Sequence, residues 1–146
     1  MIIIAVDLGR VRTGVAVCDP GEILASPVTV VTEQNEKRLR EKIHEIAQNH
    51  RAQEIVLGLP RNMDGTEGES ARHAREFGKK LQARCGLPVV MRDERGTTVT
   101  ATGYLNETNL RGKARKQTID AVAATVILQD YLDYRRNYTQ RSAENE

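Results

Sequence analysis

Three acidic residues lie beside predicted apolar strands or helices, where a carboxylate needs a compensating positive charge or metal ion. Asp7 directly follows the apolar run at residues 2–6, Glu94 ends the predicted strand 88–94, and Asp120 lies among alanines at the start of an apolar helix. An isolated charge at the margin of a core costs free energy unless it is paired. Hard divalent cations such as Mg²⁺ and Mn²⁺ prefer carboxylate and water oxygens, so a shared metal site is one such partner.

Each acid also has a structural interpretation. Asp7 could cap the turn that follows its strand, and Asp120 could complement the positive end of its helix. Glu94 lies in the run Arg-Asp-Glu-Arg at 92–95 and could form surface ion pairs. The three become a stronger prediction together, because strand ends from distant parts of the sequence meet at one edge of an α/β sheet.

Basic residues recur beside these acids, although the net charge is only +2. Positive charge next to a carboxylate site indicates a cleft for phosphates. We expect a pair of divalent ions about 3.5–4 Å apart, bound by the three acids, to support hydrolysis of phosphodiester bonds. The residues expected to bind the substrate are Arg10, Arg12, Arg61, Asn62, Lys113, Arg115 and Lys116.

The composition is that of an ordinary globular chain of 146 residues, 39% apolar and 29% charged. No apolar run is long enough to cross a bilayer, and the first residues lack the pattern of a signal peptide. These features predict a cytoplasmic protein with no membrane partner. Cys18 lies in an apolar strand and is expected to be a small core residue.

Hydrophobic periodicity predicts a mixed α/β fold. Strands are expected at 1–7, 13–18 and 28–31, joined by short turns as an antiparallel meander. A helix at 33–50 should lead to a parallel strand at 54–58, beside the first strand. Further elements are a helix at about 66–84, the strand at 88–94, and helices at about 97–106 and 116–134.

We therefore predict one domain over residues 1–134, a five-stranded mixed sheet with helices on both faces. Residues 135–146 are polar and charged, and we expect a frayed tail there. Aromatic residues amount to 3%, with no tryptophan and one phenylalanine. That composition argues against a platform for stacking unpaired bases, and favours recognition through backbone and shape.

Five segments carry a specific resemblance. They are VDLG at 6–9, TGVAV at 13–17, GLPRNMDGTEG at 58–68, DERGTT at 93–98 and IDAVAA at 119–124. In this order they resemble the YqgF family, also called RuvX, over about residues 1–134. The loop containing NMDG and the segment DER are the most specific of the five.

The resemblance implies a ribonuclease H-like fold related to the RuvC resolvases. It implies a hydrolase acting on ester bonds, a nuclease that processes the 5′ end of pre-16S ribosomal RNA during ribosome biogenesis. The family's acidic residues fall on Asp7, Glu94 and Asp120. The nucleic-acid partner would be structured precursor ribosomal RNA, and the protein would be a monomer or weak dimer.

Three other functions are compatible with the residues. A Holliday junction resolvase must cut two strands symmetrically and would usually act as a two-fold dimer. A non-catalytic RNA-binding module would keep the fold without using the acids for cleavage. An actin-like ATPase shares the pattern around Asp7 and the order of the strands, but would need a second lobe to enclose a nucleotide.

Overall fold

The computed structural model of the protein describes residues 1–62, 64–93 and 112–144, and for 112–120 and 139–144 it describes the backbone alone. Glu94 and the helix predicted at 97–106 lie outside the described residues.

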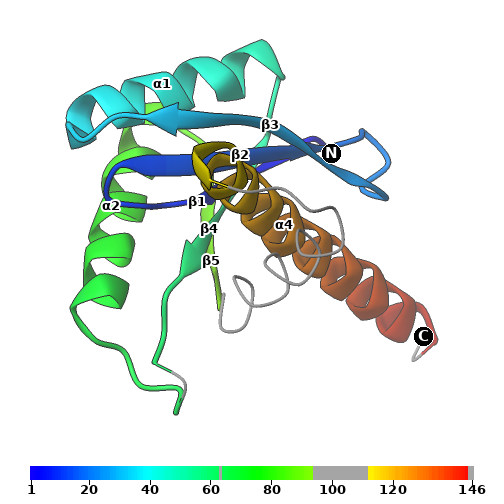
Figure 1. Ribbon diagram of the computed structural model, residues 1–146. Helices are drawn as coiled ribbons and strands as arrows, with labels where there is room; N and C mark the ends of the chain where they lie inside the picture. Colours follow the sequence, from blue (N-terminus) through cyan, green and yellow to red (C-terminus); the bar gives the residue numbers. More distant parts are fainter. Residues whose placement is uncertain (63, 94–111, 145–146) are drawn as a thin grey trace.

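A five-stranded sheet forms the centre of the molecule, in the order β3-β2-β1-β4-β5 (Figure 1). β1 (Ile3–Asp7) pairs antiparallel with β2 (Arg12–Cys18) and parallel with β4 (Glu54–Leu59). β3 (Ala25–Thr32) and β5 (Val89–Asp93) form the two edges. The predicted meander, and the parallel pairing of the first and fourth strands, are confirmed.

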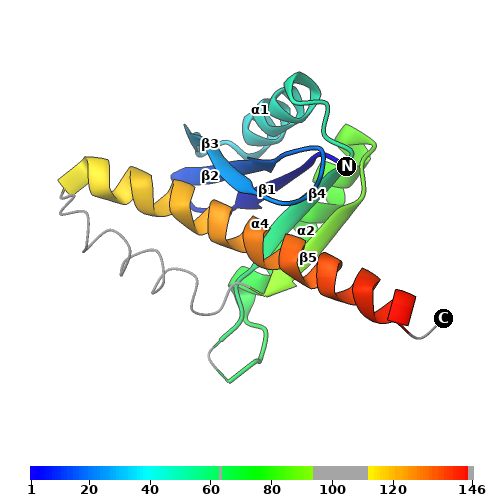
Figure 2. The same ribbon diagram turned by 90° about the vertical axis from the view of Figure 1, so that its right-hand side faces the viewer.

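Helices cover both faces of the sheet, as predicted (Figures 1 and 2). α4 (Gly112–Glu144) lies on one face, and α1 (Glu36–Asn49) and α2 (Glu69–Cys85) lie on the other. Successive side chains of β1 point alternately into the two hydrophobic cores, one on each face of the sheet. Ile3 and Ala5 pack in the cluster that contains α4, while Ile4 and Val6 pack toward α1 and α2. This alternation is why β1 is a continuous apolar run.

α1 and α2, on the face opposite to α4, begin later than predicted because hydrogen bonds just before each helix fix its first residue. Asn35 caps α1, its side chain accepting a hydrogen bond from the amide of Arg38 at 3.0 Å, so the helix begins at Glu36. The amide and hydroxyl of Thr66 both donate hydrogen bonds to the carboxylate of Asp64 in a turn, so α2 begins only at Glu69. Gly86 caps the C-terminal end of α2, and its φ of 70° is the left-handed conformation that favours glycine.

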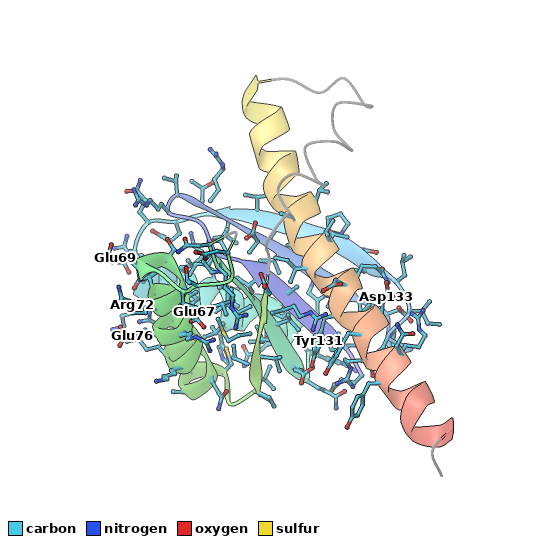
Figure 3. The ribbon with its side chains drawn as sticks, turned by 90° about the horizontal axis from the view of Figure 1, so that it is seen from below. Glu67, Glu69, Arg72, Glu76, Tyr131 and Asp133 are labelled. Atoms are coloured by element: carbon cyan, nitrogen blue, oxygen red, sulfur yellow. The ribbon has the colours of Figure 1, made fainter. Side chains whose placement is uncertain are left out.

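α4 is longer than predicted, and residues 135–144 are helical where a frayed tail was expected. Arg135 stabilises this extension by donating to Glu22 at 2.6 Å and lying 3.9 Å from Glu54. Tyr131, one turn earlier, donates to Glu54 at 3.1 Å (Figure 3). No helix in the described part of the chain is both long and apolar enough to span a membrane.

Cys18 is buried, as predicted, and its sulfur accepts a hydrogen bond from the amide of Ile3 at 3.3 Å. Burial raises the pKa of this thiol, which disfavours the reactive thiolate.

Candidate functional site

The carboxyl ends of β1, β4 and β5 meet at one edge of the sheet. The parallel registers pair Val6 with Leu57, and Leu59 with Asp93. Asp7, the loop after Leu59, and the end of β5 are thereby brought together from distant parts of the sequence. This is the edge at which ligands bind in open α/β sheets.

Asp7 lies on the α4 face of this edge. Ile3 and Ala5 pack toward α4, and side chains two residues apart in a strand share a face. Asp7 is partly buried and makes interactions with its surroundings. The carboxylate is therefore at the core margin, as its position after an apolar run predicted.

Arg92 lies on the same face, two strands away. Val90 packs in the α4 cluster, and Arg92 follows it by two residues and donates to Asp130 of α4 at 2.9 Å. In the pairing of β4 with β5, Arg92 lies opposite Gly58. Gly58 directly follows Leu57, the residue of β4 that pairs with Val6 of β1. Two strand spacings separate the backbones of Asp7 and Arg92 by about 10 Å. Gly58, between them, contributes no side chain.

The turn after β1 positions the first two predicted phosphate ligands. A Cβ on Gly9 would lie 2.1 Å from the carbonyl oxygen of Arg12, so only glycine fits this close approach. The tight turn places Arg10 in solvent and starts β2 at Arg12. Arg12 is less exposed and makes interactions of its own.

The loop after β4 is a compact turn built on its own side chains. Asn62 donates its amide nitrogen to the hydroxyl of Thr66 at 2.9 Å, and that hydroxyl donates to Asp64 at 2.6 Å. The backbone amide of Asn62 also donates to the carbonyl of Thr66. Asn62, predicted to bind substrate, therefore has an architectural role that its loop position alone did not indicate.

Arg61 connects this loop to β5 and to α2. Its Nη1 lies 3.9 Å from Asp93 and its Nη2 lies 3.6 Å from Glu67. Glu67, just before α2 (Figure 3), also accepts a hydrogen bond from the guanidinium of Arg75 at 2.7 Å. The hydrogen bond from Arg75, assisted by the charge of Arg61, lowers the pKa of Glu67. The sequence predicted Arg61 but not Asp93 or Glu67 as its partners.

A cavity of about 580 Å³ opens beside this edge, on the face of α1 and α2. Leu8, Gly9 and Arg10 line one side of it. Across its other side, Nε2 of His73 of α2 lies 2.5 Å from a carboxylate oxygen of Glu36 of α1. The cavity therefore adjoins the turn after Asp7, on the face opposite to α4.

The remaining predicted site residues are placed only by their backbone, or not at all. Lys113, Arg115, Lys116 and Asp120 belong to the first turns of α4, whose side chains are not described, and Glu94 lies outside the described residues. Within residues 1–62, 64–93 and the described side chains of α4, no group of three His, Cys, Asp or Glu could hold a metal. The proposed three-acid set extends beyond that part of the chain.

Resolvases are among the solved structures with similar folds. The RuvC structure from Thermus thermophilus superimposes with a TM-score of 0.57 and 16% identity, covering 94% of this chain and 97% of that one. Fowlpox virus resolvase, bound to substrate Holliday junction DNA, gives a TM-score of 0.58 and 12% identity over 92% and 98%. These similarities establish the ribonuclease H-like fold.

Sequence relatives are closer. A protein of Agathobacter rectalis named "Putative pre-16S rRNA nuclease" is 43% identical over 140 residues, 94% of this chain and 98% of the relative. A protein of the same name in Anaeromyxobacter sp. strain K is 44% identical over 132 residues, 90% and 96% respectively. The family model RuvX, described as Holliday junction resolvase, matches residues 1–134. The chain therefore belongs to the RuvX family.

Proposed function

We propose that this protein is a metal-dependent nuclease that hydrolyses phosphodiester bonds in the 5′ leader of pre-16S ribosomal RNA, in the cytoplasm. Membership of the RuvX family supports a nuclease role, and the relatives' name supports this substrate. The observation that carries the proposal is the position of Asp7, a partly buried carboxylate at the end of the central parallel strand.

Helix geometry supports Asp120 as a second carboxylate of this site. The hydroxyl of Tyr131 donates a hydrogen bond to Glu54. Glu54 lies opposite Ile3, at the start of β1, in the parallel pairing of β1 with β4. Position 120 is eleven residues earlier in the helix, or about 16 Å at 1.5 Å per residue. β1 rises about 13 Å from Ile3 to Asp7, so the two carboxylate positions come to the same end of the sheet.

Small residues allow that approach. Ala124 is fully buried and belongs to the same cluster as Ala5 and Ala16 of the sheet. Position 120 precedes Ala124 by one helical turn and so shares its side of the helix. The alanines around Asp120 were expected to bring the helix close to β1, and the packing of Ala124 supports this.

Glu94 would complete the set. It directly follows β5 in the sequence, and its carboxylate would be the third acid of the site. In this arrangement β4, which ends in Gly58 and Leu59, needs no acid of its own. Glu94 would replace it from the neighbouring strand.

Carboxylates from three elements suit hard divalent cations, and fit Mg²⁺ or Mn²⁺ better than a softer metal. A pair of such ions, when bound, would stabilise the charge that develops at phosphorus as water attacks. The chain's own task is to orient the substrate. Arg10, Arg12 and Arg61 lie around the edge to contact flanking phosphates, and Asn62 holds the loop that carries Arg61. Lys113, Arg115 and Lys116, at the start of α4, would clamp the nucleic acid.

Resolution of Holliday junctions is the second candidate, favoured by the family description and by a fold shared with resolvases. Symmetric cleavage of two strands requires two sites related by two-fold symmetry. We propose instead that the protein acts as a monomer or weak dimer on one strand.

The experiment that separates the candidates compares two labelled substrates, a pre-16S leader fragment and a four-way DNA junction, with Mg²⁺, Mn²⁺ or EDTA. Metal-dependent cleavage of the leader at a defined position, with the junction intact, supports the proposal. Symmetric cleavage of the junction by a dimer, with the leader intact, would assign the protein to resolution.

A further inference from the structure

We propose that Tyr134 and Tyr138 of α4, together with Arg92 of β5, form a stacking platform for unpaired bases of the RNA strand that enters the candidate site. The RNA identity of this strand rests on the proposed function. All three side chains of the platform lie in the described part of the chain.

The three side chains form a continuous stack. The guanidinium of Arg92 lies over the ring of Tyr134, 4.6 Å from its centroid. The rings of Tyr134 and Tyr138 are stacked, with centroids 6.4 Å apart and an angle of 27° between their planes. Asp130 accepts a hydrogen bond from Arg92 at 2.9 Å, and this bond holds the guanidinium over the ring of Tyr134.

Both rings are exposed to solvent, Tyr134 by 50% and Tyr138 by 65%. They lie one turn apart on α4, outside the stripe that packs on the sheet through Leu128, Tyr131 and Leu132. The other aromatic side chains in the described part of the chain, Phe77 and Tyr131, are buried. Single exposed apolar groups need no explanation, but a pair stacked beside an arginine makes a surface suited to a flat π-system.

The stack begins at the edge that carries the candidate site. Arg92 and Asp7 lie on the same face of the sheet, with backbones about 10 Å apart across two strand spacings. From Arg92 the stack continues along α4 toward its C-terminal end, and the end of β5 lies beside the middle of α4 (Figure 2). A strand with its phosphate at Asp7 would pass this surface with its neighbouring nucleotides.

Charge favours stacking over simple attraction to phosphate. Arg92, the cation that lies over the ring of Tyr134, is paired with Asp130, so its charge is largely compensated. Every base has a π-face, and stacking on an aromatic side chain tolerates any sequence. An unpaired RNA strand is therefore the ligand that fits, whereas a duplex keeps its bases stacked on one another.

Composition alone did not predict these stacked rings. A 3% aromatic content argued against a stacking platform. Composition counts aromatic residues but does not locate them, and two of the four tyrosines come together at one exposed place.

The chain has no tryptophan, so Tyr138→Trp would report on the platform as the protein's sole indole. We expect an unpaired 12-nucleotide RNA, added in EDTA to prevent cleavage, to quench the Trp emission, and a blunt duplex of the same sequence to quench it far less. Leu24→Trp is the matched control. Leu24 is 63% exposed on the β2–β3 turn, whose backbone is contacted by Gln129 and Arg136 on another side of α4. Its emission should not change.

A second measurement separates stacking from charge. Replacing both Tyr134 and Tyr138 by Ala should weaken binding of the same RNA about tenfold, while the dependence of affinity on salt stays unchanged. Replacing both by Phe should preserve the affinity. Circular dichroism of each variant establishes that the helix is intact.

The outcomes distinguish this proposal from the proposed function. No quenching and unchanged affinity of the Ala variant overturn the platform, even if the wild type cleaves the leader. Trp emission that changes with protein concentration instead of RNA would assign the rings to contact between copies of the chain, and also overturns it. Quenching by unpaired RNA without any cleavage would support the platform while the nuclease function fails.

Discussion

Arg61 and Asp93 join two neighbouring strand ends, with the guanidinium Nη1 3.9 Å from the carboxylate. Arg61 lies two residues after the end of β4, and Asp93 ends β5. Glu67 holds the other side of the guanidinium at 3.6 Å. This arrangement positions the guanidinium of Arg61 at the edge of the sheet that carries Asp7, where the substrate's phosphates are proposed to bind.

Replacing Arg61 by Gln should weaken binding of leader RNA for all sequences alike. Because one phosphate contact is lost, the slope of log affinity against log salt concentration should decrease by about one. Fluorescence anisotropy in EDTA measures both. Arg72→Gln, an exposed arginine on α2 (Figure 3), is the control and should change neither. An unchanged slope for Arg61→Gln would mean that Arg61 serves only its ion pairs with Asp93 and Glu67.

The close contact between α4 and the sheet predicts an effect of enlarging Ala124. Ala124→Leu should destabilise the fold by about 1–3 kcal/mol, because Ala124 is fully buried in the cluster with Ala5 and Ala16, and added carbons overpack such a core. It should also reduce cleavage, since α4 would move Asp120 away from β1. Urea unfolding and the leader assay test the two effects. Ala83→Leu, on the exposed face of α2, should change neither, and an active Ala124→Leu would separate this packing from the site.

The turn after Asp7 should not tolerate a side chain at Gly9. Gly9→Ala places a carbon 2.1 Å from the carbonyl oxygen of Arg12, and relieving that clash should cost about 2–3 kcal/mol. Gly68→Ala is the matched change, because the nearest atom there is 3.8 Å away. Thermal unfolding of the two variants should show a large decrease in Tm for the first and a small change for the second. Equal Tm values would refute the constraint.

Glu22 connects the chain's amino terminus to α4, and its stabilising effect should depend on pH. It accepts from Arg135 at 2.6 Å and from the amino group of Met1 at 3.3 Å. Chiefly through the bond from Arg135, the pKa of Glu22 is lowered from its ordinary value of 4.5. Glu22→Gln should lower the free energy of unfolding by about 2 kcal/mol at pH 7.

A carboxylate with a lowered pKa in the folded state stabilises the protein above its unfolded pKa, and the effect is lost as pH falls through the folded pKa. The difference between wild type and Glu22→Gln should therefore be full above pH 4.5 and shrink in more acidic solution. A difference that is constant across this range would contradict the ion-pair account.

Much of the fold could be predicted from local pattern. The apolar run of β1 and the helical spacing in α1 each specify an element, and the short turns of the meander specify antiparallel pairing. Helix ends were less predictable, because they depend on contacts such as Asn35 with Arg38. The extension of α4 depends on Arg135 meeting Glu22, a partner 113 residues away.

The site was predictable only in part, for a related reason. The position of Asp7 at the core margin could be predicted, because an acid directly after a buried apolar strand must lie at the strand's end. The partners of Arg61 could not, because the register between β4 and β5 decides that Asp93 comes beside the loop. The exposure of Tyr134 and Tyr138 likewise follows from how α4 crosses the sheet, which periodicity does not determine.

The most direct test of the nuclease proposal is cleavage of a 5′-labelled pre-16S leader fragment by wild type, Asp7→Asn and Asp133→Asn, each with Mg²⁺, Mn²⁺ or EDTA. Asp133 is an exposed acid on α4, and its replacement is the same chemical change away from the proposed site. We predict cleavage by the wild type and Asp133→Asn with metal, none in EDTA, and a loss of at least a hundredfold for a folded Asp7→Asn. Equal, metal-independent cleavage by all three proteins, or equal RNA binding without cleavage by any, would contradict the proposed role of Asp7.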